Sequence, residues 1–255
     1  MRIAAYSDIH GNPIALEAVL TDIEAQGGVD QTIVVGDLAA IGPAPVEVLE
    51  RLAAVENTIF VRGNTETYLL TNTVPPPSTE DVQRDPSLAE LATSVARSFG
   101  WTQGAITQAG WLDWMVDLPL EQRLSLPDGT RLLAVHAAPG RDDGPGVEPL
   151  TPKETLEDWV KGCDADLVLV GHVHQAGDYP LTQVRIVNVA SVGNPMEADL
   201  KASWVLIEAD QNGYDLTFYR VDYDREAVID LTHRVRQPAA EYIISFLKGE
   251  KVRSA

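Results

Sequence analysis

Short apolar runs alternate with amphipathic stretches over the first 65 residues, a pattern typical of βαβ units in a largely parallel sheet. The predicted strands are residues 3–6, 32–35 and 58–61. After the first strand, Asn12 is a favourable N-cap and Pro13 a favourable first helical residue, so a helix is expected that ends at the glycines of 27–28. A second helix is expected over residues 45–56.

A different pattern follows, and it predicts a helical insertion over about residues 67–118. Residues 71–86 contain three consecutive prolines and scattered acidic residues, which predict a flexible loop. Residues 87–99 and 102–116 are each expected to be helical. The three tryptophans of the insertion are interpreted as its own core, with a base-stacking platform as the alternative. Such an insertion could hang as a separate piece and cap a site.

The last part of the chain predicts antiparallel pairing and a second sheet. The turn Pro127-Asp128-Gly129 separates two strand-like runs and is typical of a hairpin. Thr151 can cap a helix that extends to about Gly162. The remaining predicted elements are strands at residues 122–126, 130–135, 167–170, 184–189, 203–208 and 214–221, and a terminal helix at 238–247. A single domain over residues 1–255 is expected, because a chain of this length can bury a full core.

Charge and cysteine content narrow the choice of partners. Acidic residues outnumber basic ones by 38 to 19, so nucleic acid polymers and anionic membranes are not expected as partners. The single cysteine, Cys163, excludes an intrachain disulfide and a thiolate zinc site, and it is interpreted as an inert buried thiol. Any metal must therefore be held by nitrogen and oxygen. A chain without a leader pattern or a run of about 18 apolar residues is expected to be cytoplasmic.

Five predicted strands end in groups that can bind a metal ion. These groups are Asp8 with His10, Asp37, Asn64, His136, and His172 with His174. Ligands of α/β sheets gather at the carboxyl ends of strands, so these side chains are expected to converge. Residues two apart in extended backbone point to the same side, which would pair the first two residues and the last two. Glycines 36, 63 and 171 permit the close approach that a crowded centre needs.

The donor set contains four imidazoles, two carboxylates and one amide oxygen, which suits two divalent cations better than one tetrahedral zinc. If Asp37 bridges, each cation has four protein ligands. Mn, Fe, Zn and Ni all fit such ligands, so the metal identity stays open. Two ions and two carboxylates leave a local charge of about +2, which would attract a phosphate into an acidic protein. Paired ions can bind phosphate oxygens, activate a water and stabilise the leaving oxygen.

Taken in order, these motifs resemble the motif set of the calcineurin-like metallophosphoesterase family. They are Asp8-x-His10, Gly36-Asp37, Gly63-Asn64-x-Glu66, His136 and Gly171-His172-x-His174. The resemblance runs from residue 3 to about 195, and its end, Ser191-Val192-Gly193-Asn194-Pro195, is similar to small bacterial members. It implies an α/β fold of the α+β type, a four-layer αββα sandwich of two mixed β-sheets flanked by helices. It also implies a binuclear metal centre and a phosphodiesterase or phosphatase activity.

The resemblance also implies a role for each ligand. The first ion would take Asp8, His10, bridging Asp37 and His174, and the second would take Asp37, Asn64, His136 and His172. Asp37, Asn64 and His136 are also the expected catalytic residues. Many members carry a histidine after the asparagine that protonates the leaving group, and Thr65 stands there in this chain. Good leaving groups, such as aryl or nucleotide esters, are therefore expected to be favoured.

Three further residues carry weaker expectations. Asn12 is a helix cap first and a candidate substrate contact second. Arg141, five residues after His136, could reach a phosphate through its guanidinium or could be a solvated loop residue. His233 is expected to lie on the surface.

The leading functional hypothesis is a two-metal-dependent hydrolase acting on a small phosphate ester, such as a nucleotide, or on a phosphoprotein. The alternative is a catalytically weak metal-binding scaffold for protein–protein interaction, which loss of metal ligands would favour; none is lost. A nucleotide-binding module without hydrolysis would need a glycine-rich phosphate loop such as G-x-x-x-x-G-K-S/T, and the sequence has none. The natural substrate and the oligomeric state are left open.

Overall fold

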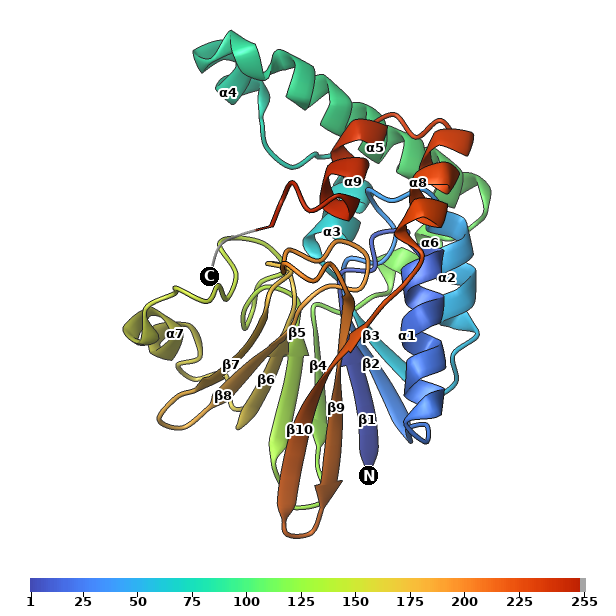
Figure 1. Cartoon of the computed structure of the whole chain (residues 1–255). Coiled ribbons are helices and arrows are strands. Elements are labelled where there is room, and N and C mark those ends of the chain that lie inside the picture. The colour runs from blue at the N-terminus through green and yellow to red at the C-terminus, as the bar shows by residue number, and fades with distance from the viewer. Residues whose placement is uncertain (253–255) are drawn as a thin grey trace.

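Two five-stranded sheets pack face to face at the centre of the computed structural model, which describes residues 1–252 (Figure 1). The first sheet has the order β10 (Gly213–Val221), β9 (Ala202–Asp210), β1 (Arg2–Tyr6), β2 (Gln31–Val35) and β3 (Thr58–Val61). The second sheet has the order β4 (Glu121–Ser125), β5 (Arg131–Val135), β6 (Leu167–Val170), β8 (Arg185–Val189) and β7 (Ala176–Pro180). Both sheets are mixed, because a parallel core of three strands continues into antiparallel neighbours.

Alternation of buried side chains builds the layers. On β1, Ile3 and Ala5 point into the apolar layer between the sheets, whereas Ala4 and Tyr6 point toward the helices. β6 divides its side chains in the same way between the inner layer and the outer face of the second sheet. A strand that is buried on both faces has a continuous run of apolar residues, as β1 and β6 do. The predicted sandwich of two mixed sheets flanked by helices is confirmed.

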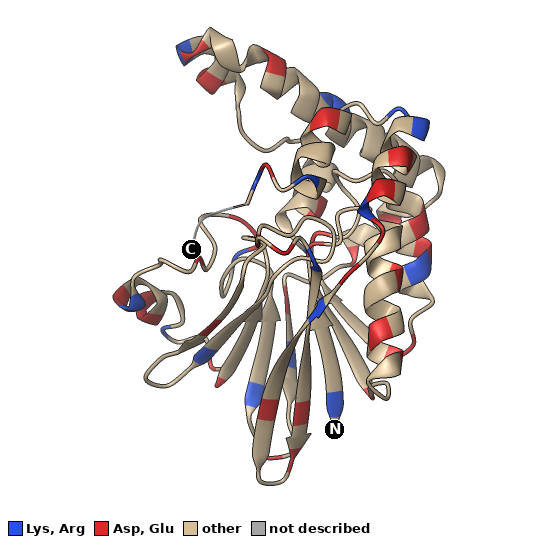
Figure 2. Cartoon of the chain, viewed as in Figure 1, with Lys and Arg blue, Asp and Glu red and all other residues tan. Residues whose placement is uncertain are grey.

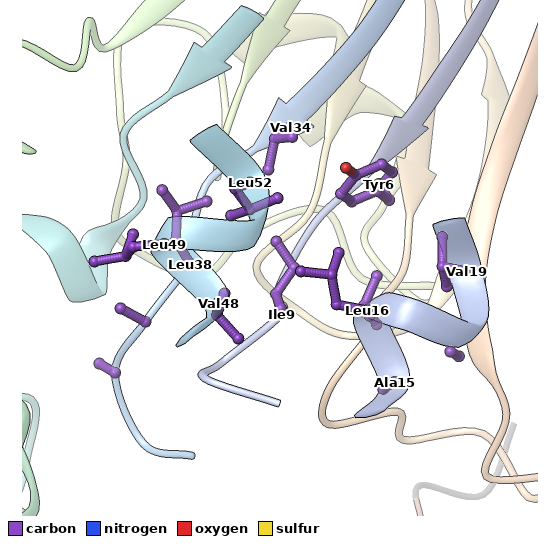
Figure 3. Packing of buried hydrophobic residues seen from close by; sticks show 14 of the residues in the cluster. Tyr6, Ile9, Ala15, Leu16, Val19, Val34, Leu38, Val48, Leu49 and Leu52 are labelled. Carbon is purple, nitrogen blue, oxygen red and sulfur yellow. The ribbon is translucent and has the colours of Figure 1, made fainter. Parts of the chain in front are cut away.

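Helices cover the outer faces of both sheets. α1 (Pro13–Ala25) and α2 (Pro45–Ala53) lie on the first sheet, and Figure 3 shows Leu16 and Val48 in the cluster that these helices form with β1 and β2. As predicted, Asn12 caps α1, because its Oδ1 accepts the N–H of Ala15 at 3.0 Å. α7 (Lys153–Trp159) covers the second sheet. Acidic residues lie on the outer helices and on loops above the strand ends (Figure 2).

The insertion begins after β3 of the first sheet and ends at β4 of the second sheet. It contains α3 (Asn64–Thr71), α4 (Thr79–Arg84), the 3-10 helix η1 (Pro86–Leu88), α5 (Ala89–Gln108) and α6 (Leu112–Val116). Phe99, Ile106 and Met115 are buried in the cluster that also packs on β1, so this part is not a separate piece. By contrast, α4, η1 and residues 89–97 of α5 bury no residue and project from the molecule (Figure 1). The terminal helices α8 (Arg225–Arg234) and α9 (Ala240–Leu247) join the same cluster.

The expected second sheet of late strands is wrong in one respect. β9 and β10 belong to the first sheet, where Leu206 of β9 lies opposite Ala4 of β1. The strands themselves were predicted from their apolar patterns, but a pattern does not state the partner of a strand. The β4–β5 hairpin at Pro127-Asp128-Gly129 is confirmed.

Two predictions within the insertion, a flexible loop and a pair of helices, are wrong. Residues 71–86 are not one flexible loop, because α4 and η1 occupy part of them. Ser78 begins α4 with a reciprocal pair of hydrogen bonds to Asp81, a capping box. α5 runs unbroken where two helices were expected, because each of its two glycines, Gly100 and Gly104, costs only about 1 kcal/mol and the packing of Phe99 and Ile106 offsets this cost.

Several boundaries and elements differ from the predictions as well. β7, α3 and α8 were not predicted, α2 ends at Ala53, and α9 begins at Ala240. Thr151 does not cap α7, because its hydroxyl accepts the N–H of Glu148 at 3.0 Å. Within residues 1–252, no helix has the length and apolar character needed to cross a membrane.

Candidate metal centre

The predicted ligands lie where β1, β2, β5 and β6 end, together with the first residue of α3. The backbone at five of them, Asp8, His10, Asp37, His172 and His174, is left-handed, with φ between 49° and 73°. Asp and His tolerate this region better than most residues, yet it is sparsely populated and clusters at functional sites. The pairs Asp8 with His10 and His172 with His174 therefore converge through tight turns, and not through the strand alternation that was expected.

One group of ligand atoms forms what we call the inner set: Asp8, His10, His174 and Oδ2 of Asp37. Nε2 of His10 lies 3.1 Å from Nε2 of His174, 3.7 Å from Oδ1 of Asp8 and 3.7 Å from Oδ2 of Asp37. Nε2 of His174 lies 3.1 Å from Oδ1 of Asp8. These side chains are buried, and the ring of Phe246 on α9 lies 6.3 Å from that of His174.

A second group forms the outer set: Asn64, His136, His172 and Oδ1 of Asp37. Oδ1 of Asn64 lies 3.0 Å from Nε2 of His136 and 2.9 Å from Nδ1 of His172. Nε2 of His136 lies 3.5 Å from Oδ1 of Asp37. His136 is fully buried, whereas Asn64 and His172 are half-buried and form the open side of the site. Asp37 thus presents one carboxylate oxygen to each set.

Backbone carbonyls orient the imidazoles. Nδ1 donates to the carbonyl of Ala40 in His10, of Val35 in His136 and of Asn194 in His174, at 3.2, 2.6 and 2.8 Å. Because a carbonyl can only accept, each of these rings keeps the lone pair of Nε2 for the centre. His172 is turned the other way: its Nε2 donates to the carbonyl of Gly144 at 2.8 Å, and Nδ1 faces Asn64.

Thr65 and Glu66 of α3 hold Asp37 in place. The N–H and the hydroxyl of Thr65 both donate to Oδ1 of Asp37, at 3.0 and 2.9 Å. The carboxylate of Glu66 accepts the N–H groups of Asp37, Leu38 and Gly63 at 2.8–2.9 Å. A Cβ atom at Gly63 would overlap the Asp37 carboxylate, so the expected need for glycine at this position is confirmed. Asp37 is therefore fixed from α3 on one side and from its own strand on the other.

Electrostatics in the centre favour positive charge. Burial would raise the pKa of Asp8, but the imidazoles of His174 and His10 hold it well below its usual range. Burial likewise opposes the ionisation of Asp37, and the neighbouring His136 lowers its pKa. In His136, burial is again outweighed, and the carboxylate of Asp37 raises the pKa of the ring. Two buried carboxylates thus create a place that stabilises a cation.

The geometry of these side chains fits the binding of metal. Oδ1 of Asp8 is buried and accepts no hydrogen bond within the part of the chain that the structure describes. Ligands at about 2.1 Å from one ion lie about 3–3.4 Å apart, and the contacts within each set are close to this spacing. Asp8 with His10 and His174, and Asp8 with Asp37 and His136, are also groups whose ligand atoms all lie within 4.8 Å of one another.

Comparison with known proteins agrees with this geometry. A model of calcineurin-like phosphoesterase sequences matches residues 1–176. The chain belongs to this family. It is 28% identical over 254 residues to an uncharacterized protein of Methanocaldococcus jannaschii, covering 92% of this chain and 93% of the relative. The family membership expected from the motifs is therefore confirmed, and metal-dependent hydrolysis of a phosphate ester is the supported reaction class.

Two solved structures are similar over almost the whole phosphoesterase chain. A metallophosphoesterase from Sphaerobacter thermophilus matches with a TM-score of 0.71 and 25% identity, covering 98% of this chain and 99% of that one. A hypothetical protein from Pyrococcus horikoshii OT3 has the same fold, with a TM-score of 0.77 and 21% identity over 96% of this chain and 97% of that one. The similarity includes the helices beyond residue 176.

The predicted substrate contacts do not join the ligand cluster of this phosphoesterase. Both ends of the Asn12 amide are used elsewhere, on Ala15 and on the carbonyl of Gly193. The guanidinium of Arg141 lies 4.8 Å from the ring centre of Trp159 on α7. Their substrate roles stay predictions. His233 is exposed on α8, as expected, and Cys163 is half-buried instead of fully buried.

Other residues around the centre were missed by sequence reasoning. The hydroxyl of Ser191 donates to the carbonyl of Asp8 at 2.9 Å and accepts the N–H of Asn194 at 2.9 Å, so this segment supports the inner set. The segment was noticed only as a resemblance. Phe246 and the carbonyl of Gly144 had no signal at all, because one is an ordinary apolar residue and the other belongs to the backbone.

Proposed function

We propose that this chain is a two-metal-dependent phosphoric ester hydrolase, in which the inner and outer sets each hold one divalent ion and Asp37 bridges them. The observation that carries the proposal is the orientation of Asp37, whose two oxygens face two separate groups of ligands. All seven predicted donors contribute to these groups. A complete donor set supports an enzyme over a metal-bearing scaffold for protein–protein interaction.

When bound, paired divalent ions supply phosphate binding, activation of a water nucleophile and stabilisation of the leaving oxygen. The protein residues position that chemistry. Asn64 and His172 lie on the open side, so a phosphate ester would approach the outer set first. His136 and Asp37 are locked by Val35 and Thr65, which keeps their ligand atoms in place as substrate enters and leaves.

A proton donor for the leaving group is missing at the expected place. The hydroxyl of Thr65 is buried and donates to Asp37, and Glu66 is buried with its carboxylate occupied by backbone N–H groups. Neither can reach a leaving oxygen. The enzyme therefore favours phosphate esters whose leaving group departs without a proton, such as aryl or nucleotide esters. General acid catalysis is commonly worth about 10²–10⁴ in rate, and simple alkyl esters would lose that contribution.

The proposal is tested by metal reconstitution followed by kinetics. The protein should hold about two divalent ions per chain by elemental analysis, with Mn, Fe, Zn and Ni compared in turn. It should hydrolyse bis(4-nitrophenyl) phosphate or 4-nitrophenyl phosphate, and kcat/KM should fall steeply across an ester series as the leaving-group pKa rises. Trace occupancy after reconstitution would overturn the two-ion centre. A shallow slope would show that another group supplies the proton.

A further inference from the structure

The open side of the centre is bordered by α3 and by the loop of residues 141–146. Gly144 of this loop accepts a hydrogen bond from Nε2 of His172 at 2.8 Å, so the loop touches an outer-set ligand directly. A Cβ atom at Gly146 would overlap His172 and Val173, which shows how closely the loop packs against the turn that carries His172. Side chains on this loop therefore border the route by which a substrate reaches the outer set.

Tyr68 connects α3 to this loop. It lies one helical turn after Asn64 and so on the same face of α3. Its ring packs edge-on against Phe99 at 6.0 Å, and its hydroxyl donates to Oδ2 of Asp143 at 2.6 Å. Tyr68 thus holds the carboxylate of Asp143 beside the open end of the outer set.

Two neighbouring acidic residues on the loop differ in how their charge is balanced. Asp142 pairs with Arg62 at 3.2 Å and also accepts the hydroxyl of Thr67. Asp143 accepts only neutral donors, the Tyr68 hydroxyl and the N–H of Gly144, and forms no ion pair among residues 1–252. Arg141, the nearest cation along the chain, stacks on Trp159. Asp143 is therefore an uncompensated negative charge held in a defined position at the mouth of the site.

We propose that the Tyr68–Asp143 pair makes the site select singly charged phosphodiesters over doubly charged phosphomonoesters. The inference rests on the proposed function. Above pH 7 a phosphate monoester carries close to two charges because its second pKa is about 6, whereas a diester carries one. Repulsion from a fixed carboxylate acts on each of these charges and is weakened by salt in solution. Asp143 thus opposes the monoester more strongly than the diester.

Asp143→Asn tests the charge, because Oδ1 of the amide can still accept the N–H of Gly144 while its NH2 donates to the hydroxyl oxygen of Tyr68. We expect kcat/KM for 4-nitrophenyl phosphate to rise about tenfold, equivalent to about 1.4 kcal/mol, and kcat/KM for bis(4-nitrophenyl) phosphate to change less than about twofold. The matched control is Asp215→Asn on β10, near the far end of the sandwich; Asp215 is exposed like Asp143, so this variant removes the same charge away from the centre. If kcat/KM for 4-nitrophenyl phosphate rises equally in the two variants, the effect comes from the net charge of the protein, and the proposal is overturned.

Binding gives a second measurement that does not depend on turnover. By calorimetry on metal-loaded protein, Asp143→Asn should tighten binding of phenylphosphonate about tenfold and leave its singly charged methyl ester within about twofold. Tyr68→Phe frees the Asp143 side chain without removing its charge. It should change the ratio of the dissociation constants of phenylphosphonate and its methyl ester in the same direction, by about threefold. Circular dichroism of each variant checks that the fold is retained.

The outcomes separate this inference from the proposed function. A wild-type protein that hydrolyses neither ester after reconstitution would contradict the proposed function. If the wild-type protein hydrolyses both esters and Asp143→Asn leaves the ratio of their kcat/KM values unchanged, the proposed selection by charge is contradicted but the proposed function is not.

Discussion

The inner and outer sets use similar ligands but differ in their enclosure. Asp8 of the inner set is completely buried, and His10 and His174 are 2% and 7% exposed under the segment of Ser191 and the helix that carries Phe246. In the outer set, Asn64 and His172 are half-buried, and the residues next to them, Tyr68 and Gly144, border solvent. One phosphoesterase centre thus combines a closed half and an open half.

Holding an ion requires enclosure of its ligands, whereas admitting a substrate requires access from solvent. The closed half is surrounded by segments far apart in the sequence, so its ligands can change position only if several elements move together. The open half is completed by one helix and one loop, and α3 is only eight residues long. In the proposed two-ion centre, an ion in the inner set would therefore be the more permanent one, and substrate would exchange at the outer set.

Replacing the ligand shared by both halves should have the largest effect. Asp37→Asn keeps the shape of the side chain and its contact with Thr65 but removes the negative charge between the two sets. Activity should fall by about 10³, comparable to the loss of a strong electrostatic contact in an active site. His233→Ala, a substitution of an exposed residue on α8, is the control. Similar kcat/KM values for the two variants would show that the site has been misplaced.

Metal release should distinguish the two halves directly. Mixing the loaded protein with excess chelator should give a fast phase from the outer set and a slow phase from the inner set, because solvent reaches them differently. His172→Ala should remove the fast phase and weaken the binding of one ion by about 100-fold. His174→Ala should remove the slow phase and weaken the binding of the other ion by a similar factor. A single release rate in the wild-type protein would contradict the division into closed and open halves.

The smallest expected effect concerns the cover of the inner set. Phe246→Leu retains an apolar side chain on α9 but removes the ring beside His174. Release of the inner ion should become faster by no more than about tenfold, with the outer ion unaffected, because the apolar surroundings of a metal control access by solvent. Tyr242→Phe, on the same helix, should leave both rates unchanged. An effect of Phe246→Leu confined to the outer ion would reverse the assignment.

Sequence reasoning was most successful where the chemistry of the side chain carried the signal. The seven donors stand in recognisable motifs after apolar runs, so their convergence could be predicted before any strand order was known. The supporting contacts could not, because they come from backbone carbonyls such as those of Val35 and Gly144, which every residue possesses. Tyr68 and Phe246 were missed for a related reason, since an aromatic residue on a helix ordinarily packs in a core.

By itself, the sequence determined most of the strands and the identity of the candidate ligands, because hydrophobic period and short motifs are local properties of the chain. The four-layer architecture was expected only through the resemblance of those motifs to the family. Only the tertiary structure decided that β9 joins β1, that the buried half of the insertion packs with the terminal helices, and that Thr65 donates to Asp37 instead of facing a substrate. Each of these depends on which distant surfaces meet. That choice follows from the packing of the whole core, which no single segment encodes.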